Sequence, residues 1–131
     1  FTDDAGNDFE LGSYTDRGDP ATNDYTVGDF TTDSTWRDLN LGPTGAGIVP
    51  AGAKAVLLRV AVKDDAAGSQ IKFRKNGHTN EINSGGSLVV VVNVTNIEET
   101  TVACDTNQVV EYWATNTVFT VINVTVKAWY T

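Results

Sequence analysis

The sequence predicts an all-β fold, a single β-sandwich of jelly-roll or Greek-key type with about eight short strands. Val, Ile, Thr and aromatic residues dominate the segments after residue 35, and turn residues such as Asn76-Gly77 separate them. Residues 56–63 and 122–130 alternate apolar and polar side chains with the period of a half-buried strand. No window shows apolar residues at helical spacing over several turns, which excludes a helical domain.

Each strand is expected where β-forming residues run between turn residues. In chain order the segments are residues 24–30, 35–41, 54–63, 69–75, 88–95, 101–105, 108–114 and 118–130. Turn signals at 50–52, 64–68, 76–77 and 84–86 divide the middle of the chain. A chain of 131 residues fits one domain. We expect residues 1–34 to form an acidic, loop-rich N-terminal arm and residues 35–131 to form the sandwich domain.

Charge is divided unevenly along the chain. Residues 1–40 hold ten acidic and two basic residues, so the whole formal net charge of −8 lies in this part. Nucleic acids and anionic lipids need a basic surface, so we expect neither as a partner. The apolar runs are too short for a membrane helix. An acidic segment suits a basic protein partner, a divalent cation, or simply solubility.

Residues that could carry catalysis are few. His78 is the only histidine and lies in a turn, and Cys104 is the only cysteine. Neither has an orienting partner nearby in sequence, so we expect no enzyme and no cofactor. The chain begins at Phe1 and contains no methionine, which indicates a processed or excised piece.

Calcium is a weak candidate ligand of the arm. Oxygen donors that Ca²⁺ accepts lie close together at Asp3, Asp4, Asp8 and Glu10. They do not match the helix–loop–helix calcium pattern, so a solvated acidic loop is the favoured interpretation. The tripeptide Arg17-Gly18-Asp19 matches a short integrin-binding motif, and we interpret it as coincidence.

Aromatic side chains are the strongest candidates for binding. If Val124, Val126 and Ala128 point inward, Trp129 points outward, and Trp113 lies opposite Val110, Tyr112 and Ala114. Outward rings can stack on a sugar or anchor a subunit interface, unless the arm folds back over them. Widely spaced rings in the arm are expected to bury in pockets on a neighbouring subunit or carrier protein: Phe1, Phe9, Tyr14, Tyr25 and Phe30.

Several stretches of residues 35–131 carry a family resemblance. They are residues 35–39, 48–60, 73–77, 102–105, 109–112 and 122–129. The chain is similar to a family of small β-domains found in phage and environmental sequences and associated with virions. This resemblance implies a virion-surface protein, extracellular after release: a capsid decoration (cement) protein, or a head- or tail-fibre domain. It also implies a homotrimer, with the major capsid protein or a fibre as partner. The alternative is a carbohydrate-binding module of a tail fibre or secreted protein, with a glycan as ligand.

Overall fold

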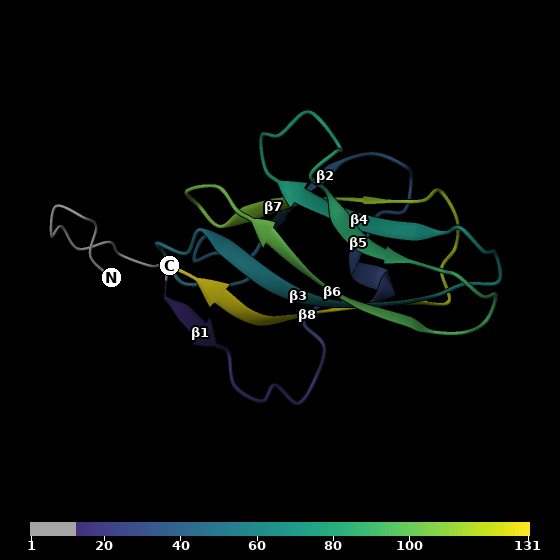
Figure 1. Cartoon of the computed structure of the whole chain (residues 1–131), viewed down its shortest axis with the longest axis horizontal. Coiled ribbons are helices and arrows are strands. Elements are labelled where there is room, and N and C mark those ends of the chain that lie inside the picture. The colour runs from purple at the N-terminus through teal and green to yellow at the C-terminus, as the bar shows by residue number, and fades with distance from the viewer. Residues whose placement is uncertain (1–12) are drawn as a thin grey trace, which may run out of the picture.

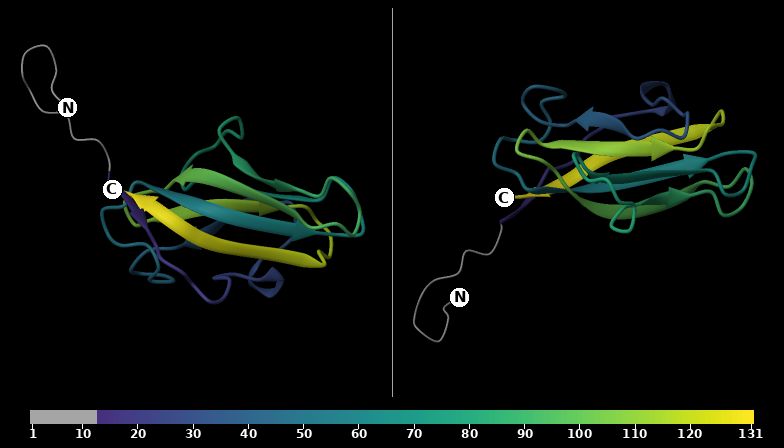
Figure 2. Two further views of the ribbon diagram at one scale, coloured as in Figure 1. Left: turned by 60° about the horizontal axis from the view of Figure 1, so that its bottom comes forward. Right: turned by 90° about the horizontal axis from the view of Figure 1, so that it is seen from above.

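The computed structural model describes residues 13–131 and shows two four-stranded antiparallel sheets packed face to face (Figure 1; Figure 2). The first sheet has the order β1-β8-β3-β6, and its strands are β1 (Tyr14–Asp16), β8 (Val121–Tyr130), β3 (Ala55–Lys63) and β6 (Asn96–Ala103). The second has the order β2-β7-β4-β5, and its strands are β2 (Arg37–Asn40), β7 (Val109–Ala114), β4 (Gln70–Lys75) and β5 (Gly85–Leu88). The expected single β-sandwich is confirmed.

Strand pairing identifies the topology. β1 pairs with β8, β2 with β7, β3 with β6, and β4 with β5, all antiparallel. The first strand therefore pairs with the last, the second with the seventh, and so on to the central pair. A single long hairpin that is wrapped into two sheets has this order of pairing. This nested pairing is that of a jelly roll.

The core lies between the sheets. Val56, Leu58, Val60 and Val62 of β3 are fully buried and alternate as the sequence predicts, while Ile71 and Phe73 of β4 face them from the other sheet. Phe119 and Leu41 close the core from the loops. Because the inner faces of both sheets are apolar, burial of these faces is the main stabilising term.

One predicted strand, residues 88–95, is wrong. Val89 is buried, but the chain then turns through Asn93, whose φ of 58° lies in the left-handed region. The strand instead precedes it, at β5, where a Cβ on Gly86 would lie 1.9 Å from the Ile71 carbonyl oxygen. Only bare backbone fits so close to β4, so the glycines that indicate a turn in the sequence form a strand here.

The remaining strands differ from expectation mainly at their ends. β6 begins at Asn96, five residues before the predicted 101. The early start was missed because none of the residues 96–99 is buried, so they show no apolar alternation. The predicted strand at residues 24–30 is wrong. In its place Tyr25 makes a single antiparallel bridge to Val124, followed by a 3₁₀ turn, η1 (Val27–Asp29). The described part of the arm contains a different strand, β1.

The two ends of the sandwich are formed by different parts of the chain. Ser13 and Thr131 are joined by paired backbone hydrogen bonds, so the arm enters the fold beside the C-terminus (Figure 1). The loops after β3, β5 and β7 lie at the opposite end (Figure 1). Among residues 13–131, no helix is long and apolar enough to cross a membrane.

Candidate functional site

The outer face of the second sheet carries a cluster of aromatic and charged side chains, here called the aromatic cluster: Trp36, Lys72, Arg74, Glu81 and Trp113. Lys72 of β4 lies opposite Trp113 of β7 in the sheet register. Trp36 immediately precedes β2, whose Arg37 pairs with the residue before Trp113. Cross-strand register therefore collects side chains from four separate segments of the chain.

Lys72 is the centre of the aromatic cluster. Its Nζ lies 4.4 Å from the centre of the Trp113 ring and 5.7 Å from that of Trp36. The same ammonium donates a hydrogen bond to Glu81 Oε2 at 3.0 Å, and Trp36 Nε1 donates to Glu81 Oε1 at 3.0 Å. The hydrogen bond from Lys72 holds the pKa of Glu81 below its usual range, so this carboxylate is ionised at neutral pH.

Arg74 extends the aromatic cluster toward β7. Its guanidinium carbon lies 3.9 Å from the centre of the Trp36 ring, and its Nε donates to Glu111 at 2.7 Å. Glu111 also accepts a hydrogen bond from the Gly77 backbone N–H at 3.1 Å. Each cation thus has a carboxylate partner and an aromatic ring, which is a rigid arrangement.

A shallow pocket of about 310 Å³ adjoins the aromatic cluster. Lys72, Glu81, Ser84 and Gln70 line it with polar groups, and Leu88 contributes an apolar side chain. Aromatic rings beside hydroxyl, carboxylate and ammonium groups are the chemistry with which proteins hold a sugar ring. This surface is therefore the best candidate for ligand binding.

Trp113 lies on the outer face as expected, because Val110, Tyr112 and Ala114 belong to the core. Trp36 was missed as a site residue. Its one signal in the sequence is that it lies three residues before the inward-facing Leu39, on the opposite side of the strand. Which neighbours it meets depends on sheet register, and the local sequence does not encode register.

The outward placement of Trp129 is wrong. Leu58 pairs with Val126 and Leu57 with Ala128, so Lys127 is an extra residue, a β-bulge. The bulge reverses the alternation, and Trp129 faces the same way as its partner Val56 and packs against the core. It is unavailable as an outer-face ring.

The rings of the arm fall into three groups. Phe1 and Phe9 lie outside the described residues. Tyr14 is half exposed and contacts Tyr130 edge to face, at 5.5 Å between ring centres. Phe30 is a core residue, and the centre of its ring lies 5.9 Å from that of Tyr25 and 5.0 Å from that of Tyr112.

The expectation that Tyr25 and Phe30 bury in a neighbouring subunit is corrected, because this chain's own core holds them. Burial is the largest cause that raises the pKa of Tyr25 to about 12. Wide spacing of rings in a sequence cannot distinguish a pocket in the same chain from one in another chain.

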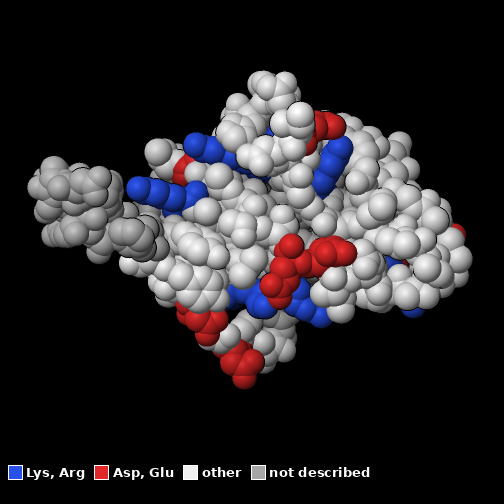
Figure 3. Space-filling view, viewed as in Figure 1, with Lys and Arg blue, Asp and Glu red and all other residues white. Residues whose placement is uncertain are grey.

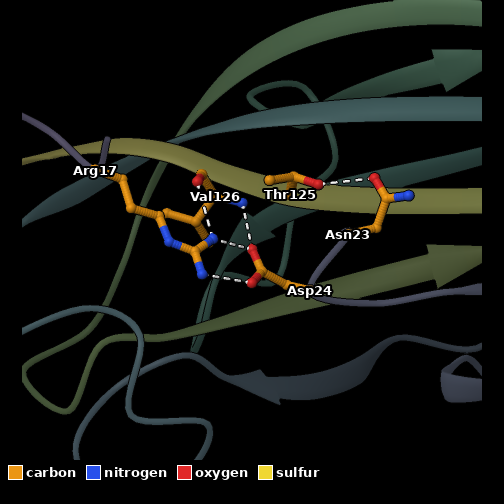
Figure 4. A network of polar contacts seen from close by, with 5 residues as sticks. All are labelled: Arg17, Asn23, Asp24, Thr125 and Val126. Atoms are coloured by element: carbon orange, nitrogen blue, oxygen red, sulfur yellow. Dashed lines mark hydrogen bonds and ion pairs between the residues drawn. The ribbon is translucent and has the colours of Figure 1, made fainter. Parts of the chain in front are cut away.

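A salt bridge between two residues of the arm is hydrogen-bonded to the backbone of β8 (Figure 4). Arg17 and Asp24 form a two-pronged ion pair, with Arg17 Nη2 to Asp24 Oδ1 at 2.7 Å. Asp24 accepts the backbone N–H of Val126 at 2.8 Å, and Arg17 donates to the Val126 carbonyl at 3.1 Å. Because these contacts hold Arg17, the guanidinium of the Arg17-Gly18-Asp19 tripeptide is not free to bind a partner. This supports the interpretation that the match to an integrin-binding motif is a coincidence.

Loop 18–23 projects beyond this salt bridge and helps to form a second pocket, of about 330 Å³. Pro20, Asn23, Arg59, Thr125 and Lys127 are among its lining residues. Asn23 accepts a hydrogen bond from the Thr125 hydroxyl at 2.9 Å, so the loop is tied to the floor of the pocket. The arm and the sheet together therefore shape this cavity.

The catalytic and metal candidates gain no support. His78 is exposed in the β4–β5 loop. Cys104 is buried, its Sγ lies 3.4 Å from the Ala53 carbonyl oxygen, and burial raises the pKa of the thiol. The calcium candidates Asp3, Asp4, Asp8 and Glu10 lie outside the described residues. Within residues 13–131 no three His, Cys, Asp or Glu side chains gather as a metal site would require.

No protein-family model matches the chain, and no curated protein is detectably similar to it in sequence.

Proposed function

We propose that this chain is a non-enzymatic structural protein of a virion surface, either a capsid decoration protein or a domain of a head or tail fibre. The observation that carries the proposal is the nested pairing of the eight strands within residues 13–131, the topology of a jelly roll. Viral capsid domains use this architecture repeatedly. The family resemblance of residues 35–131 points the same way.

The two different ends of the sandwich suit such a role. Ser13 and Thr131 lie side by side at one end, and that end suits attachment to a capsid protein or a fibre stem. The other end and the outer faces then point away from the attachment. Self-association, as a homotrimer, completes the proposal.

Immunoelectron microscopy of native particles tests the location. Antibodies raised against the purified chain should label the particle surface at regular positions, on the capsid or on the tail. Label found only on secreted material, with particles unlabelled after purification, would contradict a virion role.

A second candidate function is carbohydrate binding, which the aromatic cluster favours. Trp113 and Trp36 contact Lys72 next to one pocket, and Glu81, Lys72 and Ser84 line that pocket with hydrogen-bonding groups. Host receptors of virions include surface glycans, so the two functions are compatible in one protein.

A glycan array tests the second function. Binding to one class of glycan should fall at least about tenfold on Trp113→Ala, the typical loss for an aromatic anchor. Ile97→Ala, at an exposed residue of β6 in the first sheet, is the matched control and should bind as the unmodified chain does. Equal binding by Trp113→Ala would place any glycan site elsewhere.

A further inference from the structure

The end of the sandwich opposite the arm exposes five valine side chains, here called the valine end: Val90, Val91, Val92 and Val94 of the β5–β6 loop, and Val118 of the β7–β8 loop. Val118 is 90% exposed and Val90 is 65% exposed. The two loops meet at the end of β3, since Thr120 N–H donates to the Lys63 carbonyl and Asn93 N–H to the Asp64 carbonyl. The loops that carry the five valines therefore lie next to each other, and apolar side chains gathered on the surface of a folded domain mark a contact site.

The valine end is held firmly. The Asp64 carboxylate is buried beneath it, where it accepts the Ser69 hydroxyl at 2.6 Å and the Asp65 backbone N–H at 2.8 Å. Val89, which begins the loop, is fully buried and donates its N–H to the Ser69 carbonyl at 2.8 Å. The valines are therefore displayed by an anchored loop, and binding through them requires little ordering of the backbone.

The lack of charge on the two loops favours a second copy of this chain as the partner. Residues 88–97 and 115–120 contain no charged side chain, in a chain of net charge −8, and the β3–β4 loop beside them adds one exposed charge, Asp65. Figure 3 shows this end almost white, whereas blue and red side chains lie over the middle of the same face. Two copies of an acidic protein repel each other least where neither carries charge. By contrast, exposed charges stand on edge strands β2 (Arg37, Asp38) and β6 (Glu98, Glu99), a common protection against strand-to-strand association.

A membrane fits the valine end less well than a second copy does. Surfaces that bind lipid use Trp or Tyr at the interface and Lys or Arg against anionic headgroups. The two loops contain neither an interfacial ring of that kind nor a basic residue.

We propose that the valine end is the contact surface between copies of this chain. This inference rests on the proposed function in one respect: it names the surface for the self-association that is part of that function. The inference is tested with purified protein in solution, so its outcome does not depend on where the protein lies in a particle.

Sedimentation equilibrium of the full chain, from micromolar to submillimolar concentration, tests the proposal. The average mass should rise above the 14.0 kDa of one chain as concentration increases. Added salt should strengthen the association, because it screens the repulsion between acidic chains and favours apolar burial. The double variant Val91→Asp/Val118→Asp should weaken association at least about tenfold, since it buries charge at the contact.

Two further variants make the result decisive. Ile82→Asp adds a charge at a residue that is 99% exposed in the β4–β5 loop and should associate as the unmodified chain does. Val91→Thr/Val118→Thr removes apolar surface at constant shape and should weaken association even if the Asp variant unfolds. A chain that stays monomeric over the whole range overturns the proposal, as does undiminished association of the Thr variant. Binding of a monomeric chain to neutral phosphatidylcholine vesicles through the valines would also overturn it.

Discussion

Asp24 and Val126, 102 residues apart in the chain, are joined by a hydrogen bond of 2.8 Å from the Val126 backbone N–H to the Asp24 carboxylate. The Asp24 side chain is only 8% exposed and also pairs with Arg17. Asp24→Asn should lower the free energy of unfolding by about 1–3 kcal/mol, because the arginine loses its counter-charge in a partly buried place. Chemical denaturation measures the change. Asp19→Asn removes the same charge from an exposed neighbour and should change stability little; equal losses would show that only net charge matters.

Truncation separates the two parts of the arm. Removing residues 1–22 deletes β1 and Arg17 and exposes the backbone edge of β8. We expect this variant to melt well below one that lacks only residues 1–12, because unpaired backbone groups and the lost ion pair both destabilise it. Differential scanning calorimetry compares the two. Identical melting temperatures would mean that β1 adds nothing to stability.

Trp129 and Trp113 should contribute differently to the free energy of unfolding. Trp129→Ala removes a ring packed against the core and should lower the free energy of unfolding by about 2–3 kcal/mol. Trp113→Ala removes an outer-face ring over Lys72 and should cost about 1 kcal/mol. Denaturant titration of both variants checks the ranking. The reverse order would contradict the bulge at Lys127.

Acid should weaken the valine end through Asp64. Hydrogen bonding from the Ser69 hydroxyl is the largest cause that holds the pKa of Asp64 below its usual range. A carboxyl whose pKa is lowered by folding stabilises the protein above its unfolded pKa of about 3.9, and this contribution is lost as pH falls through the lower folded value. Ser69→Ala should therefore reduce stability by about 1–3 kcal/mol at neutral pH, and by progressively less as the pH falls below the unfolded pKa of about 3.9.

Denaturation curves at several pH values measure that dependence. The curves of Ser69→Ala and the unmodified chain should converge in acid. A constant difference at all pH values would show that the hydroxyl acts through packing and not through the charge of Asp64.

Cys104 should react slowly with thiol reagents in the folded protein. Its sulfur is buried beside the Ala53 carbonyl, and burial raises the pKa of the thiol, so little thiolate forms near pH 8. Colour release from an aromatic disulfide reagent should be slow until denaturant is added. Ile82→Cys provides an exposed thiol in the same chain and should react at once. Fast labelling of native Cys104 would mean that β6 and its loop open readily.

The candidate site was only partly predictable. Alternation along β7 placed Trp113 on the outer face correctly, because Val110 and Tyr112 have to face the core. Trp36 and Glu81 had no such signal, since their meeting depends on how β2 and the β4–β5 loop lie against β4. The run of exposed valines led to a wrong strand prediction at residues 88–95. A run of β-branched residues indicates a strand whether or not a partner strand is present.

The sequence by itself determined the fold class and most strands, because period-two alternation and turn residues act over a few neighbouring positions. It also determined that charge is concentrated near the N-terminus. Only the tertiary structure decided what depends on contacts between distant segments: the nested pairing of strands, the bulge that turns Trp129 inward, the placement of Phe30 in its own core, and the valine end. These features follow from strand register and close packing. One inserted residue reverses which side chains face the core, and one glycine packed against a neighbouring strand forms a strand where the local sequence indicates a turn.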